Sequence, residues 1–152
     1  MKAEANRLQH GALPFRRRGA VLELLLVTSR GTGRWIIPKG WPIEGLPPHV
    51  VAAREAREEA GLEGRISERA IGRFHYDKRL ADGSSLPCAV EVFALEVDQQ
   101  MPSWPERDER RTRWFALEEG AEARARTGAA GADPWPSEQA GGIGFRPWSP
   151  LI

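Results

Sequence analysis

The sequence predicts an α+β or α/β fold in which a mixed β-sheet is sandwiched between helices. Three observations lead to this class. Val21–Thr28 and Ala89–Val97 have the apolar content of strands, Pro48–Ala60 has the pattern of one long helix, and strand-like segments stand on both sides of that helix. With 152 residues, of which 41% are hydrophobic and 28% charged, the chain can bury one core and is short for two domains.

The strand candidates follow in chain order. Val21–Thr28 is rich in Leu and Val, Arg34–Ile37 is a short apolar run that ends before Pro38, and Ala89–Val97 alternates apolar with other residues. Gly64–Tyr76 and Thr112–Leu117 are weaker candidates. Between these segments lie turn-forming stretches at residues 31–33, 82–85 and 102–105.

The long helix is predicted to run from about Pro48 to Ala60. Proline suits the first helical turn, where its missing N–H costs nothing, and Gly61 suits the left-handed residue that ends a helix. A second helix is expected at Glu118–Arg126.

Three carboxylates of the long helix form its most informative feature. Glu55, Glu58 and Glu59 fall within roughly one 100° arc of the helix. The opposite side carries a seam of small residues, Ala53, Ala56 and Ala60. Because neighbouring carboxylates repel, a one-sided acidic cluster is a reasonable site for a hard divalent cation. The alternative is a solvated surface helix whose Glu residues pair with Arg54 and Arg57.

The same helix resembles the Nudix box, G-x5-E-x7-R-E-U-x-E-E-x-G-U, in which U is a bulky aliphatic residue. The matching positions are Gly40, Arg54, Glu55, Glu58, Glu59, Gly61 and Leu62. Two positions depart from the box. Leu46 stands where the box has its isolated Glu, and Ala56 stands at the first U position. Glu44 lies two residues too early to take the place of the missing Glu.

Two flanking elements extend the resemblance over about residues 11–120. Arg34–Gly40, RWIIPKG, and residues 113–115, RWF, are similar to elements of Nudix enzymes that act on diphosphoinositol polyphosphates and dinucleoside polyphosphates. The resemblance implies a Nudix-type mixed sheet between helices and hydrolysis of a phosphoanhydride. It also implies Mg²⁺ or Mn²⁺ held by Glu55, Glu58 and Glu59, with the carbonyl oxygen of Gly40 as a further ligand.

The resemblance leaves the general base open. Glu55 is the first candidate. Glu91 is the second and a further candidate metal ligand, because a carboxylate between apolar strand residues needs a partner or a metal. The alternative for Glu91 is a solvent-facing strand residue. Arg54 is expected to orient a neighbouring carboxylate and not to contact the substrate.

Binding of phosphate requires positive charge near the metal loop. The resemblance implies substrate contacts for Arg34 and Lys39, and Arg113 is a further candidate. Trp41 either stacks on a base or anchors the Gly/Pro loop by packing. The groups 16–18 and 110–111, all Arg, could extend the basic patch, although such runs are more often solvated turns.

Two classes of function remain. The first is a metal-dependent hydrolase that cleaves a diphosphate linkage in a nucleoside diphosphate derivative, a dinucleoside polyphosphate or a diphosphoinositol polyphosphate. The second is a Nudix-fold nucleotide sensor or regulator with little turnover, which the missing loop Glu favours. A 5′-end RNA pyrophosphohydrolase is less favoured, because no extended basic and aromatic stripe is visible.

The composition of the chain limits which partners and which cellular location can be expected. The net charge of +1 gives no overall attraction to nucleic acid or membrane, so a small phosphoanhydride substrate is expected, bound by a monomer or homodimer. Cys88 is the single cysteine, which favours the cytoplasm, and no apolar run is long enough for a membrane span. Residues 1–127 are expected to form the Nudix domain, and the Gly-, Pro- and Trp-rich residues 128–152 a partly ordered extension.

Overall fold

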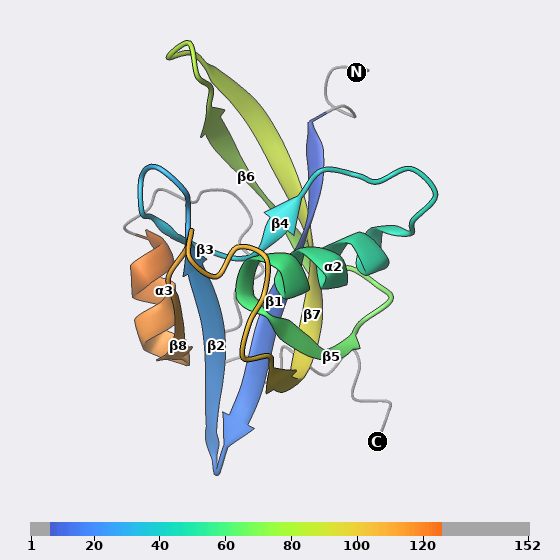
Figure 1. Cartoon of the computed structure of the whole chain (residues 1–152), viewed down its shortest axis with the longest axis vertical. Coiled ribbons are helices and arrows are strands. Elements are labelled where there is room, and N and C mark those ends of the chain that lie inside the picture. Colours follow the sequence, from blue (N-terminus) through green and yellow to red (C-terminus); the bar gives the residue numbers. More distant parts are fainter. Residues whose placement is uncertain (1–6, 126–152) are drawn as a thin grey trace.

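A computed structural model describes residues 7–125 of the chain (Figure 1). In this range one mixed eight-stranded sheet carries a helix on each face. The helices are α2 (Pro48–Ala60) and α3 (Leu117–Ala125). The strands are β1 (Leu8–Arg18), β2 (Val21–Thr28), β3 (Trp35–Ile36), β4 (Lys39–Gly40), β5 (Leu62–Ile66), β6 (Gly72–Arg79), β7 (Ser85–Gln100) and β8 (Thr112–Ala116).

The sheet is mixed because β1 and β7 run parallel while the other pairs are antiparallel. The main path is β3-β2-β1-β7-β5, with β4 paired to β1, β6 to β7 and β8 to β2. The long β6–β7 hairpin and the β1–β2 hairpin extend from opposite ends of the molecule (Figure 1). The predicted mixed sheet between helices is confirmed.

Two buried clusters hold the layers together. On one face Ala52, Ala56 and Ala60 of α2 pack on sheet residues that include Leu25 and Phe93. The other face is closed by α3, whose buried side chains join those of β1, β2, β7 and β8. Small residues on α2 let the helix lie close to the sheet, which brings the helix carboxylates near β4.

The boundaries predicted for the long helix are confirmed. Pro48 stands in the first turn, and Gly61 ends the helix at φ 69° with its amide directed to the carbonyl oxygens of Ala56 and Arg57. A Cβ at position 61 would overlap the ring of Trp104, so glycine is required here for conformation and for space.

The predicted small-residue seam is wrong in one member. Ala52, not Ala53, is buried with Ala56 and Ala60, while Ala53 is partly exposed. The buried face is therefore turned toward Glu59, which becomes one of the buried residues of α2.

Among the predicted strands, Val21–Thr28 has the predicted bounds, and the segments at 34–37, 89–97 and 112–117 are confirmed with shifted ends. The single strand predicted at 64–76 is wrong, because the chain leaves β7 after Ile66 and pairs with a different part of β7 from Gly72. β1 was not predicted at all. It contains glycine, proline and three consecutive arginines, and it becomes a strand through its pairing with β2, β4 and β7.

The second predicted helix is confirmed as α3 up to Ala125. The predicted extension at residues 128–152 lies outside the described residues. None of the helices in the described part of the chain has the length and apolar character that crossing a bilayer requires.

Candidate active site on helix α2

Gly40 and Glu55 meet at the centre of the candidate site. β4 pairs with β1, which sets Gly40 over the helix face that carries Glu55. A Cβ on residue 40 would overlap both oxygens of the Glu55 carboxylate, so any other residue here would make that carboxylate shift. The contact places the carboxylate of Glu55 against the backbone of Gly40, whose carbonyl oxygen is an expected metal ligand.

Glu59 is a buried carboxylate beside Glu55. Its exposed fraction is 3%, and its Oε1 atom is buried without a hydrogen-bond partner. Burial raises the pKa of Glu59 to about 9, an effect that the positive charge of Arg110 opposes. The nearest cation contact joins Arg110 Nη2 to Glu59 Oε2 at 3.7 Å.

Glu55 and Lys39 belong to the same electrostatic cluster. Burial raises the pKa of Glu55, and the charges of Glu58 and Glu106 raise it further. Burial lowers the pKa of Lys39 to about 8, with Glu59 acting in the opposite direction. Lys39 Nζ lies 4.7 Å from the ring centre of Tyr76, so the ammonium group meets an aromatic face within the electrostatic reach of Glu59.

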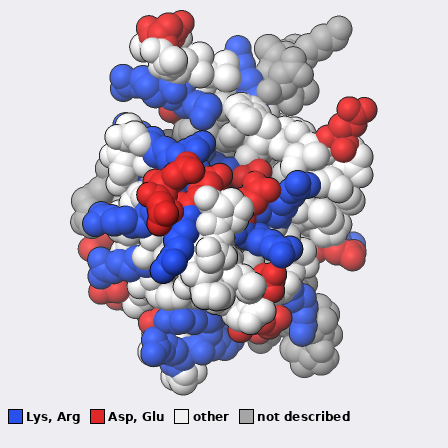
Figure 2. Space-filling view, viewed as in Figure 1, with Lys and Arg blue, Asp and Glu red and all other residues white. Residues whose placement is uncertain are grey.

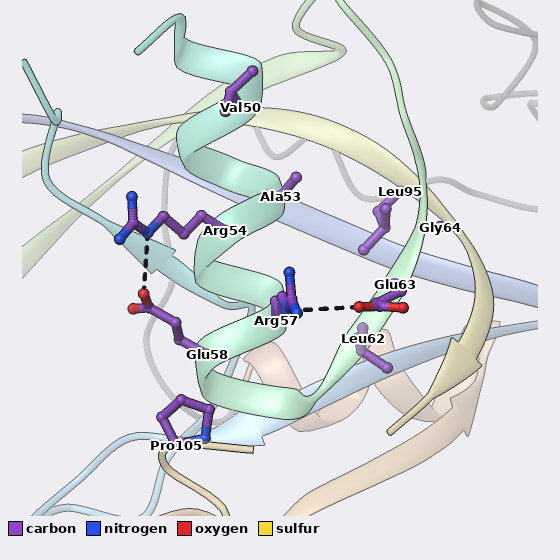
Figure 3. Close-up of a pocket in the computed structure, with 10 residues that line it drawn as sticks. All are labelled: Val50, Ala53, Arg54, Arg57, Glu58, Leu62, Glu63, Gly64, Leu95 and Pro105. Carbon is purple, nitrogen blue, oxygen red and sulfur yellow. Dashed lines mark hydrogen bonds and ion pairs between the residues drawn. The ribbon is translucent and has the colours of Figure 1, made fainter. Parts of the chain in front are cut away.

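Glu58 and Arg54 lie on the outer side of α2, where Arg54 Nε donates a hydrogen bond to Glu58 Oε2 at 3.2 Å (Figure 3). The two side chains are 53% and 38% exposed. Arg54 thus contacts a carboxylate of the box, which is the kind of role expected from the sequence. Beside them lies a groove of about 610 Å³ lined by Val50, Ala53, Arg54, Arg57, Glu58, Leu62, Glu63, Gly64, Leu95 and Pro105. This groove adjoins Glu58 but not Gly40 or Lys39.

The structure adds two residues that sequence reasoning missed. The loop at residues 101–111 returns to α2, where the amide of Glu106 donates to the carbonyl oxygen of Glu58 at 3.1 Å. Arg110 Nε donates to Glu106 Oε1 at 2.7 Å, and its side chain is only 9% exposed. From the sequence, Arg110 either extends a basic patch or lies in a solvated turn, and its low exposure contradicts the solvated turn. The pair of Arg110 and Glu106 is local, four residues apart, whereas their contacts with Glu59 and Glu58 arise only because the loop returns to α2, and the local sequence carries no signal for that return.

Glu91 is set apart from the helix carboxylates. In the sheet His10 of β1 is the register partner of Gly40 on one side and of Glu91 on the other. Glu91 Oε1 lies 3.1 Å from His10 Nδ1, so its partner is a histidine. One strand therefore separates Glu91 from Gly40, a span of roughly 10 Å between strand axes.

The remaining candidates are spread over the surface. Arg34 and Trp41 are exposed, and Leu46 is partly exposed. Arg113 is exposed and lies over the ring of Phe115, with its guanidinium carbon 4.7 Å from the ring centre. Arg113 is the register partner of Leu26, which packs in the cluster that faces α3, whereas the helix carboxylates lie on the other face. The structure thus brings Lys39 to Glu59 but does not bring Arg113 there.

Acidic side chains gather at one place on the viewed face of the molecule (Figure 2). Figure 2 shows acidic side chains gathered near the middle of the viewed face, over the region of α2, with lysine and arginine side chains around them. Such an arrangement gives a local negative field for a cation, flanked by positive charge for an anionic ligand.

The donor set fits a hard divalent cation. Among residues 7–125, no three acidic, histidine or cysteine side chains already converge as a ready metal site. However, Glu59 Oε1 has no hydrogen-bond partner, Glu55 and Glu59 both have raised pKa values, and the Glu55 carboxylate lies directly against the backbone of Gly40. A cation would relieve the like-charge repulsion, and carboxylate and carbonyl oxygens are the ligands that Mg²⁺ and Mn²⁺ prefer.

Comparison with known proteins agrees with this geometry. Residues 6–135 match the family model of the NUDIX domain. The chain is 28% identical over 133 residues to Nudix hydrolase 16, mitochondrial, from Arabidopsis thaliana, covering 79% of this chain and 73% of that relative. It is 31% identical over 116 residues to diphosphoinositol polyphosphate phosphohydrolase 3-alpha from Mus musculus, covering 69% of this chain and 66% of that relative.

Among solved structures, an Ap4A hydrolase from C. elegans superposes with a TM-score of 0.55 at 20% identity, covering 95% of this chain and 96% of that one. At that identity the likeness concerns the fold. The chain spans 73% of the length of Nudix hydrolase 16 and 47% of the length of Nudix hydrolase 4, both from Arabidopsis thaliana. The box residues on α2, the mixed sheet between two helices and the family match over most of the chain lead to one conclusion: the chain belongs to the Nudix hydrolase family.

Proposed function

We propose that the chain hydrolyses a phosphoanhydride linkage with the help of Mg²⁺ or Mn²⁺. One observation carries this proposal. Glu55 lies against Gly40 while Glu59, with an orphan oxygen, lies buried beside it, so the parts of the Nudix box that lie far apart in the sequence meet in space. A protein with no use for a cation would gain nothing from holding two neighbouring carboxyl groups here, one of them buried.

The proposed division of roles follows the geometry. Glu55, Glu58 and Glu59 with the carbonyl oxygen of Gly40 would hold the cation. Arg54 would fix Glu58 through the hydrogen bond between them. Lys39, next to Glu59, is the substrate-binding residue with the strongest support, and Arg34, Trp41 and Arg113 are proposed from the sequence alone.

The reaction needs a base and charge neutralisation. A bound divalent cation would neutralise charge on the phosphoryl oxygens. A carboxylate accepts a proton from water, the water oxygen forms a bond to phosphorus, and the bridging P–O bond breaks, so that the leaving phosphate takes the electron pair. Glu55 is the first candidate for the base, because it lies at the centre of the site. Glu91, held by His10 and separated from Gly40 by a strand, is the second.

For the substrate class we propose a nucleoside diphosphate derivative, a dinucleoside polyphosphate or a diphosphoinositol polyphosphate. The names of the mouse relative and of the C. elegans structure support the last two classes. The basic side chains around the acidic patch in Figure 2 suit a ligand with several phosphate groups.

A second function, a nucleotide sensor or regulator with little turnover, is favoured by two features of this chain. Leu46 replaces the loop Glu of the box, and Arg110 places a positive charge 3.7 Å from Glu59, where a cation would otherwise contribute that charge.

One experiment separates the two functions. The purified protein is incubated with each substrate class in Mg²⁺ or Mn²⁺ and ¹⁸O-labelled water, and the products are analysed by mass spectrometry. We expect label in a phosphate product, and Glu55→Gln should lower kcat far more than it weakens substrate binding. Tight binding without turnover of any substrate would favour the sensor.

The cellular location, the class of ligand and the oligomeric state are also proposals. A cytoplasmic location follows from the single cysteine, although the names of several Arabidopsis relatives place those proteins in the mitochondrion or chloroplast. A small-molecule substrate and a monomer or homodimer are proposed, and the net charge of +1 argues against nucleic acid.

A further inference from the structure

Arg110 is the cation most deeply engaged with the candidate active site. Its three contacts go to three separate parts of the chain: Nε donates to Glu106 Oε1 at 2.7 Å, Nη1 donates to the carbonyl oxygen of Thr28 at 3.1 Å, and Nη2 lies 3.7 Å from Glu59 Oε2. With 9% of its side chain exposed, this guanidinium group is shielded from the solvent that weakens surface ion pairs.

The contacts connect the loop at residues 101–111 to both the sheet and the helix. Thr28 belongs to β2, Glu59 to α2, and Glu106 to the loop itself. At the same place the Glu106 amide donates to the carbonyl oxygen of Glu58. The result is that Glu106, which the Nudix box does not contain, is held within the electrostatic reach of Glu55.

We propose that Arg110 is a positioning residue for the hydrolytic reaction, holding Glu106 and Glu59 in place as two carboxylates of one site. This inference rests on the proposed function for its catalytic consequence, and on the contacts alone for its structural part. A lysine could supply the charge but not the separate Nε and Nη1 hydrogen bonds, because its single ammonium group lacks the planar fork of arginine.

A matched control is the ion pair that joins Glu109 of the same loop to Arg30, just after β2. Arg30 Nη1 donates to Glu109 Oε1 at 2.7 Å, and both side chains are about half exposed. This pair also ties the loop to the strand region that ends at Thr28, but it does not touch Glu55, Glu58 or Glu59. Arg30→Ala therefore loosens the loop from outside and leaves the site carboxylates with their partners.

The first test uses kinetics in Mn²⁺. Arg110→Gln should lower kcat by about 10- to 100-fold with a change in KM of less than about threefold, because misplaced catalytic groups act on the transition state more than on binding. Arg110→Lys should recover part of the loss, and Arg30→Ala should stay within about twofold of the wild type. In the Glu106→Gln background the Arg110→Gln change should lower kcat by a smaller factor than in the wild type. The reason is that the carboxylate of Glu106, which Arg110 holds in place, is already absent. Equal factors in both backgrounds, or equal losses in Arg30→Ala and Arg110→Gln, would overturn the proposal.

The second test needs no turnover. Hydrogen exchange of the Glu106 amide reports whether the loop is docked on α2, since that amide donates to Glu58. Exchange should be about tenfold faster or more in Arg110→Gln and unchanged in Arg30→Ala. Unchanged exchange in Arg110→Gln would show that Arg110 does not position Glu106. If the wild type turns over no substrate, the proposed function fails, yet this measurement still decides the structural role of Arg110.

Discussion

The backbone of Gly40 lies so close to the carboxylate of Glu55 that a Cβ at position 40 would displace that carboxylate. β4 contributes the glycine and α2 the glutamate, so the contact joins the sheet to the helix at the candidate active site. This contact is the point at which fold and proposed chemistry depend on the same two residues.

Replacement of Gly40 should therefore reduce both the stability of the fold and the binding of metal. Gly40→Ala places a methyl group where the Glu55 carboxylate lies, so the carboxylate must shift, and we expect a loss of about 1 kcal/mol in the free energy of unfolding, at the low end of the overpacking range. The Mn²⁺ response of the melting temperature should weaken as well, because Glu55 must move. Denaturant unfolding and thermal melting with and without Mn²⁺ measure the two effects.

A double variant supplies the control. In Gly40→Ala/Glu55→Ala the shortened side chain leaves room for the new methyl group. If the overlap is the cause, the alanine at position 40 should cost much less in this background than in the wild type. An equal cost in both backgrounds would place the cause elsewhere in β4.

Glu59 should make the metal-free protein less stable as the pH rises. Its pKa is about 9 in the folded protein and 4.5 ordinarily, so between these values the folded chain holds a proton that the unfolded chain has released. Stability therefore falls with rising pH, by about 2 kcal/mol from about pH 6.5 to about pH 8 for this group alone. The window begins at the ordinary histidine value of 6.5, because the pKa of His10 is lowered and its titration acts mainly below that pH, and it ends near the Lys39 pKa of about 8.

Melting temperatures in the presence of a chelator test this slope. Glu59→Gln should flatten the dependence in that window. Glu63→Gln, which changes a partly exposed carboxylate on β5, should leave it as it is. A slope that persists in Glu59→Gln would mean that another group holds the proton.

Divalent metal should stabilise the folded chain through the same carboxylates. Mn²⁺ at about 100 times its dissociation constant should raise the free energy of unfolding by about 2.7 kcal/mol, since a ligand that binds only the folded state stabilises it. Glu55→Gln/Glu59→Gln should abolish this rise. Glu118→Gln, on the exposed first turn of α3, should preserve it. Calorimetric titration of Mn²⁺ provides an independent affinity, and an unchanged affinity in the double variant would remove Glu55 and Glu59 from the metal site.

Position 46 should accept the carboxylate that the Nudix box carries there. Leu46 is partly exposed and joins neither of the two buried clusters, so Leu46→Glu should change the free energy of unfolding by only about 0.5 kcal/mol. If the loop reaches the metal, Mn²⁺ affinity should increase several-fold, because one more carboxylate adds charge and an oxygen ligand. Unaltered affinity with retained stability would show that the site operates without this position.

The box residues and the α2 boundaries could be predicted from the sequence because local rules govern them. Pro48 and Gly61 mark the ends of a helix through their backbone preferences, and the spacing of Glu55, Glu58 and Glu59 places them on neighbouring parts of its surface. The strand at Val21–Thr28 was recognised for the same reason, since its own side chains carry the apolar pattern.

The tertiary structure alone decided which carboxylates share a site. Glu106 reaches the helix through a returning loop, and Glu91 is held by His10 on the far side of β1, although nothing in their local sequences distinguishes the two outcomes. The same holds for Arg110, which reads as a surface arginine and is buried between Glu59 and Glu106. Secondary structure follows from interactions between near neighbours, whereas burial and pairing of charges depend on which distant segments the sheet brings together.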